Sequence, residues 1–153
     1  MGTKTFFKRR FERRSIYISF FLISFCASCS RQPVYPEPSL KGSEVAIEVK
    51  KLRPENPLFL TYRHHRKNIN FFVLKIDDKV VSFLDACMSC YPSKRGYRFD
   101  GGYITCKTCD IRYSLAEIEE GVGSCSPIRL EGHLQDGNYL IPVSLLEESA
   151  DKF

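Results

Sequence analysis

The sequence predicts a small, mainly β domain that carries two cysteine knuckles and one or two short helices. Apolar residues alternate with other residues in a period of two, as Val45, Ile47 and Val49 do, and this period is typical of a half-buried strand. Asp and Gly residues separate several of these segments, which favours hairpins. Two Cys-x-x-Cys motifs come directly after such segments, so we expect a β scaffold to hold their thiols at strand ends.

The expected elements follow one another along the chain after residue 44. Strands are expected at residues 45–49, 58–62, 69–76, 80–84, 97–99, 103–105, 130–135 and 139–141. Hairpin turns are expected at 77–79, 100–102 and 136–138. Ser114 and Glu117 have the spacing of a helix capping box, and Gly121 can end that short helix. A last helical turn is expected at 144–147.

The two motifs have the spacing of a metal site. Cys87 and Cys90 form the first knuckle, Cys106 and Cys109 form the second, and fifteen residues lie between them. Two such turns at this separation can close a tetrahedral site of four thiolates. Zinc and iron, including iron–sulfur clusters, accept such a site. The alternative is two local redox pairs or two disulfides.

The N-terminus is typical of a bacterial lipoprotein signal. Six Lys and Arg residues precede an apolar run at residues 16–25, which is short for a bilayer because a spanning helix needs about 20 residues. Ala27 and Ser28 then precede Cys29, as at a lipoprotein processing site, although Cys26 stands where Leu is usual. We expect a signal peptide at residues 1–28 and a lipid on the Cys29 thiol; the alternative is an uncleaved anchor helix.

The remaining chain divides into a tether and a domain. Residues 29–43 contain three prolines and are predicted to be a Pro-rich tether, and residues 44–153 are predicted to form the metal-binding domain. The protein is therefore expected in the bacterial cell envelope, anchored to the membrane and facing the periplasm or the exterior.

Charge argues against a nucleic-acid partner. The chain has 23 Lys and Arg against 18 Asp and Glu, but the first 28 residues hold six of the basic residues and one of the acidic ones, which leaves 17 of each. The basic balance belongs to the targeting segment and indicates no binding to nucleic acid.

Several motifs occur in a fixed order after residue 82. They are Phe-Leu-Asp-Ala-Cys at 83–87, Tyr-Pro-Ser-Lys-Arg-Gly-Tyr at 91–97, the second knuckle, Gly-Ser-Cys-Ser-Pro-Ile-Arg-Leu at 123–130 and Leu-Ile-Pro at 140–142. This run resembles the FtrD-like membrane iron–sulfur protein family over about residues 68–147. The resemblance implies an iron–sulfur or metal site in a membrane-associated protein with a role in electron transfer or iron handling. Because some members are linked with ferrous-iron permease systems, it also implies a membrane redox or iron-permease partner.

A second resemblance is to the cluster-binding part of Rieske proteins, where two loops hold a [2Fe–2S] cluster. There each loop supplies one Cys and one His, whereas every corresponding position here is Cys. The expected fold class is accordingly a small Rieske-like or zinc-ribbon-like β domain. An all-thiolate cluster should have a reduction potential toward about −400 mV, below that of His-ligated centres.

Cys125 stands apart from the knuckles in a Gly-rich stretch. It is interpreted as an accessory ligand or redox thiol, as a disulfide partner of one of the four knuckle cysteines, or as a buried structural thiol.

Cations also gather near the knuckles, where they either tune an anionic centre or form an ordinary solvated face. They are Lys94, Arg95, Arg98, Lys107 and Arg112.

The function that these observations favour is a redox carrier or accessory protein rather than an enzyme with its own substrate. No Ser-His-Asp order, phosphate-binding loop or paired carboxylates stand out, which argues against a hydrolase. An iron–sulfur cluster or iron is the preferred cofactor. The alternatives are a structural four-cysteine zinc module that binds a partner and a thiol–disulfide redox protein, although the latter lacks the βαβ context of thioredoxin-like enzymes.

Overall fold

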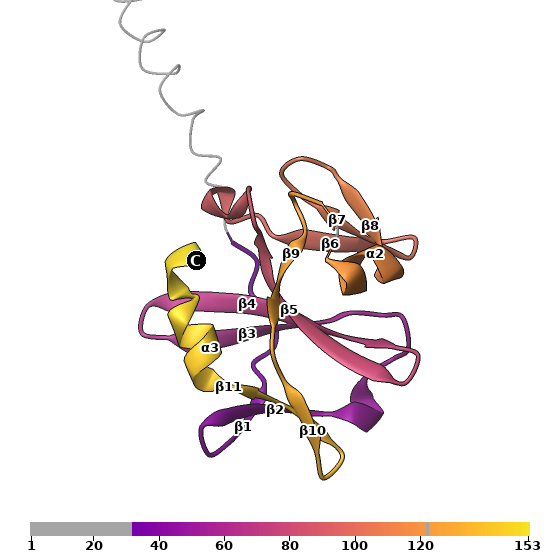
Figure 1. Ribbon diagram of the computed structural model, residues 1–153. Helices are drawn as coiled ribbons and strands as arrows, with labels where there is room; N and C mark the ends of the chain where they lie inside the picture. Colours follow the sequence, from indigo (N-terminus) through magenta and orange to yellow (C-terminus); the bar gives the residue numbers. More distant parts are fainter. Residues whose placement is uncertain (1–31, 122) are drawn as a thin grey trace, which may run out of the picture. The chain divides into compact units, whose positions relative to one another are not determined.

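The computed structural model describes residues 32–121 and 123–153, which fold into three antiparallel sheets and two short α-helices (Figure 1). The predicted mainly β fold class is confirmed. Sheet A contains, in spatial order, β1 (Ser39–Lys41), β2 (Glu44–Glu48), β11 (Asn138–Pro142) and β10 (His133–Gln135). Sheet B contains β3 (Leu58–His64), β4 (Lys67–Ile76), β5 (Lys79–Cys87) and β9 (Pro127–Leu130). Sheet C contains β6 (Tyr97–Asp100), β7 (Tyr103–Cys106) and β8 (Arg112–Ser114).

Short helices connect or follow these strands. The α-helices are α2 (Leu115–Glu120) and α3 (Val143–Glu148), and the 3-10 helices are η1 (Val49–Lys51), η2 (Tyr91–Ser93) and η3 (Ala150–Lys152). Within the described residues, none of the helices combines the length and the apolar character that crossing a membrane requires.

Sheet B is the centre of the domain because both of its faces are buried. Successive residues of a strand point to opposite faces. On β4, Phe71 and Val73 belong to a core shared with sheet A, whereas Phe72 and Leu74 belong to a core shared with sheet C. All four side chains have no exposed surface. The unbroken apolar run at residues 71–74 is what a strand covered on both faces requires.

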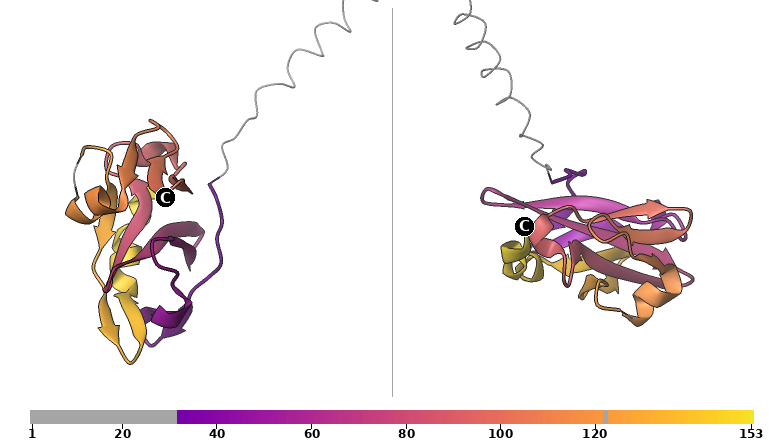
Figure 2. Two further views of the ribbon diagram at one scale, coloured as in Figure 1. Left: turned by 90° about the vertical axis from the view of Figure 1, so that its right-hand side faces the viewer. Right: turned by 90° about the horizontal axis from the view of Figure 1, so that it is seen from above.

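The two cores differ in what they contain. The core between sheets A and B is made of aliphatic and aromatic side chains, with Leu146 of α3 and Phe153 packed into it. The core between sheets B and C also contains aromatic residues, but it includes three thiols, those of Cys87, Cys106 and Cys125. The site-bearing end, with sheet C and α2, lies opposite β1 and β2 in both side views of the domain (Figures 1 and 2).

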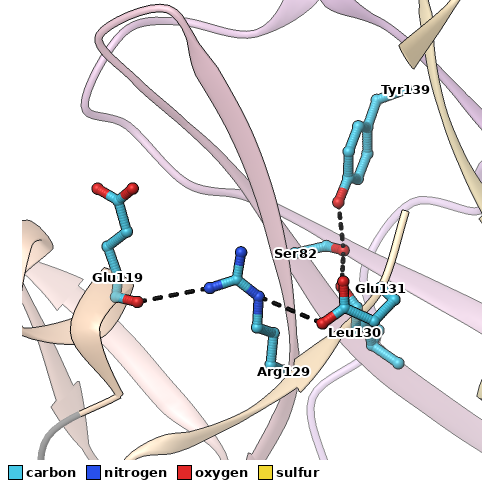
Figure 3. Close-up of polar contacts among 6 residues, drawn as sticks. All are labelled: Ser82, Glu119, Arg129, Leu130, Glu131 and Tyr139. Atoms are coloured by element: carbon cyan, nitrogen blue, oxygen red, sulfur yellow. Dashed lines mark hydrogen bonds and ion pairs between the residues drawn. The ribbon is translucent and has the colours of Figure 1, made fainter. Parts of the chain in front are cut away.

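Polar contacts join β9 to β5 and α2, and join β5 to β11 (Figure 3). The Ser82 hydroxyl of β5 donates to the Leu130 carbonyl of β9 at 2.8 Å and lies 3.1 Å from the Tyr139 hydroxyl of β11. Arg129 of β9 donates to the Glu119 carbonyl of α2 at 3.4 Å. These contacts hold the strand that follows Cys125.

The N-terminal segment docks on sheet B, although the sequence predicts a tether there. The Tyr35 N–H donates to Thr61 Oγ1 at 2.8 Å, and the Pro36 carbonyl accepts from the Thr61 N–H at 3.0 Å. The Tyr35 ring packs against Phe59, with ring centroids 5.1 Å apart. Figure 2 (left) shows this segment, in indigo, running along the length of the domain. Prolines lack a donor but keep their carbonyls, so a Pro-rich segment can still lie along a strand.

Three strands lie where the sequence predicts none. β1 falls inside the predicted tether and pairs with β2, β8 pairs with β7, and β9 pairs with β5. The strand expected at 130–135 is in fact divided, because β9 ends at residue 130 and β10 begins at residue 133. Each of these strands has only three or four residues, too few to show a clear alternation.

The predicted helix after Ser114 is confirmed together with its cap. The Ser114 hydroxyl accepts from the Glu117 N–H at 3.3 Å, and the Glu117 carboxylate accepts from the Ser114 N–H at 2.7 Å. The helix ends at Glu120 and is capped by Gly121, which has a φ of 71°. This left-handed conformation is one that glycine adopts readily.

Candidate metal centre

Strand ends hold both knuckles beside the core between sheets B and C. β5 ends at Cys87 and β7 ends at Cys106, so the first cysteine of each knuckle still belongs to a strand. These two thiols are 2% and 1% exposed, whereas Cys90 is half-buried and Cys109 is exposed. Each knuckle therefore has a buried inner thiol, Cys87 or Cys106, and an outer thiol nearer to solvent, Cys90 or Cys109.

The structure brings five sulfur atoms together. The Sγ atoms of Cys87, Cys90 and Cys125 all lie within 4.8 Å of one another, and so do those of Cys90, Cys106 and Cys109. The Cys125 Sγ is 3.8 Å from the Cys90 Sγ and 3.4 Å from the Cys109 Sγ. Cys90 thus lies close to all four other sulfurs, and Cys125 makes short contacts to both outer thiols.

Contacts distant in sequence place the Cys125 thiol, which is 6% exposed. The Tyr97 hydroxyl donates to the Cys125 carbonyl at 2.6 Å, across 28 positions of sequence. The Ser89 hydroxyl of the first knuckle donates to the Ser124 carbonyl at 2.7 Å, across 35 positions. Sequence spacing could not place Cys125 because these contacts form only in the folded domain. All five described cysteines are free thiols.

Backbone N–H groups of the knuckles stabilise negative charge on sulfur. The Cys90 N–H donates to the Cys87 Sγ at 3.2 Å. Burial opposes ionisation of Cys87, but hydrogen bonds from the N–H groups of Cys90 and Ser89 and from the Cys125 and Cys90 thiols together outweigh it, and the pKa of Cys87 is lowered. Hydrogen bonding with Cys109, followed by burial, raises the pKa of Cys125 to about 11. Because thiols this close repel one another once ionised, a cation among them is needed before all can act as thiolate ligands.

Asp85, two residues before the first knuckle, connects the segments around the site by hydrogen bonds. Its carboxylate is 4% exposed and accepts from the Tyr97 N–H at 2.6 Å and from the Tyr35 hydroxyl at 3.3 Å. Gly96 lies so close to this carboxylate that a Cβ could not fit. The Gly96 carbonyl accepts from the Lys107 N–H of the second knuckle at 2.9 Å. One carboxylate therefore links the docked N-terminal segment, β5 and the chain that supports the second knuckle.

Burial raises the pKa of Asp85 to about 7, although the Tyr97 N–H and nearby Lys107 favour the ionised form. The sequence interpretation includes Asp85 only as part of the motif at 83–87 and assigns it no role. A signal was present, because an acid inside a mostly apolar strand needs buried partners.

The predicted cations near the knuckles differ in their surroundings. Arg98 pairs with Asp110 at 3.0 Å, and the Arg112 guanidinium lies over the Tyr103 ring, 4.5 Å from its centroid.

The predicted lipidation residue, Cys29, and the predicted signal peptide lie outside the described residues.

The donor set fits zinc, iron or an iron–sulfur cluster, since all three accept thiolates held in this way. A comparison with curated proteins returns no match. Residues 55–153, well over half of the chain, match the family described as membrane iron–sulfur containing protein, FtrD-like. That range includes both knuckles, Cys125 and Asp85. The chain therefore belongs to the FtrD-like family of membrane iron–sulfur containing proteins.

Proposed function

We propose that this protein is a membrane-anchored, extracytoplasmic metal-binding protein of the iron–sulfur type, which transfers electrons to a membrane partner or handles iron with it. The observation that carries the proposal is the convergence of five thiols in a chain of an iron–sulfur family. The family description also names a membrane protein, and the lipoprotein-like sequence around Cys29 supports the anchor and the side of the membrane.

The proposed ligands are Cys87, Cys90, Cys106 and Cys109, with Cys125 as an accessory ligand or redox thiol. When bound, an iron or iron–sulfur centre supplies a site that takes up and releases single electrons. The chain holds the ligands still through the two strand ends, shields the inner thiols from water within the core between sheets B and C, and directs N–H groups at sulfur. These are the features by which a protein sets the potential of such a centre.

The test is anaerobic purification followed by metal and sulfide analysis and a visible spectrum. We expect iron in a fixed ratio to protein and absorption in the visible range, because iron–thiolate centres are coloured. A colourless protein with stoichiometric zinc would overturn the redox role and favour the structural zinc module. A protein without metal, whose cysteines cycle between thiol and disulfide, would favour thiol–disulfide chemistry.

A further inference from the structure

One end of the five-thiol centre is open to solvent. The inner thiols and Cys125 are buried, whereas Cys109 is exposed and Cys90 is half-buried. Electron exchange falls off steeply with distance, so a partner must approach the centre from the side of the two outer thiols. Whatever surrounds Cys90 and Cys109 therefore decides which partner can come close.

A large, exposed apolar side chain stands close along the chain to each outer thiol. Six such side chains are exposed in the described part of the chain, and two of them stand within two residues of an outer thiol: Met88, 58% exposed, and Ile111, 41% exposed. Met88 lies inside the first knuckle. The Ile111 carbonyl accepts from the Cys106 N–H at 3.0 Å, which holds Ile111 on the turn of the second knuckle. Met is enriched where proteins contact one another, and such a contact surface combines apolar side chains with a polar, charged edge.

Two free cations complete this surface. The Ser93 and Thr108 hydroxyls are 2.5 Å apart, which places the turn after η2 beside the second knuckle. Lys94 and Arg95 follow in that turn and are exposed. Neither forms an ion pair within the described part of the chain.

The charge of this end stands out against that of the chain as a whole. Residues 87–112 hold five basic and two acidic residues, whereas residues 29–153 hold equal numbers. A local excess of one sign around a reactive centre attracts partners of the opposite sign and raises their rate of encounter. We call the surface formed by these groups the outer rim; it consists of Met88, Cys90, Lys94, Arg95, Cys109 and Ile111.

We propose that the outer rim is the docking surface for the anionic face of a redox protein, which exchanges electrons with the centre past Cys90 and Cys109. Its use in electron exchange rests on the function proposed above, but the surface can be tested without it. A protein partner fits better than a lipid surface, because attraction to anionic lipids takes a cluster of about four to eight basic residues. Of the five basic residues at 87–112, Arg98 pairs with Asp110 and Arg112 lies over the Tyr103 ring, which leaves three.

The first experiment measures how fast small oxidants of opposite charge react with the reduced full-length protein. Each ferricyanide ion takes one electron from the centre and becomes ferrocyanide, and hexaammineruthenium(III) becomes hexaammineruthenium(II). The K94E/R95E variant should react at least about fivefold more slowly with ferricyanide and faster with the ruthenium complex. The control variant K41E/K50E reverses two exposed charges on β1 and η1, at the other end of the domain (Figure 1), and should change neither rate. Equal effects in both variants would overturn the proposal.

The second experiment needs no redox activity. The paramagnetic anion hexacyanochromate(III), added to zinc-loaded protein, should broaden the amide signals of Met88, Lys94 and Ile111, and K94E/R95E should abolish this broadening. Broadening elsewhere, or none, would overturn the docking surface. So would broadening of these signals by phosphatidylglycerol vesicles alone at physiological ionic strength, which would identify a lipid surface instead. A protein that holds only zinc would not reduce the oxidants of the first experiment, which would overturn the proposed function. The broadening measurement would still show whether the outer rim binds anions.

Discussion

A carboxylate buried beside a group of thiols is unfavourable unless its oxygens are satisfied. Asp85 has two donors, the Tyr97 N–H of β6 and the Tyr35 hydroxyl of the N-terminal segment, and through them it connects segments that are far apart in sequence. The residue therefore acts on the geometry of the centre through its neighbours and contacts no sulfur itself in the hydrogen-bond network. We expect its substitution to change stability in a way that depends on pH.

The first prediction concerns Asp85→Asn. An unfolded chain releases the Asp85 proton near its ordinary pKa of 3.8, whereas the folded domain retains it to about pH 7. The folded state therefore binds more protons between these values, and the free energy of unfolding should fall as pH rises through this window, by at most about 4 kcal/mol, and stay level above it. The Asn variant should lack this fall. Equal slopes in the two proteins, measured by denaturant unfolding at matched metal content, would contradict the assignment.

The second prediction compares two glycines with similar backbone conformation. Gly96 has a φ of 65° and Gly42 a φ of 60°, but only at Gly96 would a Cβ collide with a side chain, the Asp85 carboxylate. Gly42→Ala should cost about 1 kcal/mol for the left-handed conformation alone. Gly96→Ala should cost about 3 kcal/mol and lower the metal content. A similar loss in both variants would show that the contact with Asp85 has no effect.

The third prediction separates Cys125 from the knuckle cysteines. Cys87→Ala should lose metal and destabilise the domain, because binding energy at such a site is also folding energy. Cys125→Ala should retain the metal but shift the visible spectrum or the reduction potential. Ser124→Ala is the matched control, because the Ser124 side chain is exposed and only its backbone carbonyl takes part in holding the loop; it should change neither quantity. Complete loss of metal from Cys125→Ala would make Cys125 a primary ligand, and an unchanged spectrum and potential would leave it a packing residue.

At the scale of elements, the short helix α2 depends on its cap. Ser114→Ala removes the hydroxyl that accepts from the Glu117 N–H, and the free energy of unfolding should fall by about 1 kcal/mol. Ser144→Ala is the control: Ser144 is exposed in α3, whose cap uses no side chain, so the change should be near zero. Thermal unfolding of the two variants decides this. A matching loss in Ser144→Ala would argue against a capping role.

Local patterns predicted the elements that bury their own side chains. The sequence predicts β2, β3, β4 and β5, because each of these strands contains either an alternation of apolar residues or an apolar run. The strands β1, β8 and β9 were not, since they form by pairing with the edge of a longer strand. The site divides in the same way. Both knuckles were visible as a local spacing, whereas the Tyr35 hydroxyl reaches Asp85 across 50 positions, and no local pattern reports such a contact.

At the scale of the whole molecule, sheet B separates a core that only stabilises the fold from a core that also contains the candidate metal centre. One face of sheet B packs on sheet A with aliphatic and aromatic side chains, and the other face packs on the thiol-containing core. Substitutions on the two faces should therefore differ in kind. Those facing sheet A should change stability first, and those facing sheet C should also change the centre.

The last prediction concerns the anchor. Cys29→Ser should block attachment of lipid and leave an unprocessed precursor, whereas Cys26→Ser should retain the lipid because the thiol that carries it, that of Cys29, is still present. Incorporation of labelled fatty acid in cells, followed by gel mobility, measures both. Equal incorporation into the Cys29→Ser protein would exclude the lipoprotein assignment and favour an uncleaved anchor helix.

The docking of the N-terminal segment limits how far such an anchor could let the domain move. The Gln32 side chain already donates to the Asn68 carbonyl of β4 at 2.7 Å, and only two residues separate Gln32 from Cys29. Three steps of extended chain span at most about 11 Å. With a lipid at Cys29, almost no free chain would remain between the membrane surface and the docked segment. Its partner would have to meet it at the bilayer surface, because the domain could not travel outward to find one.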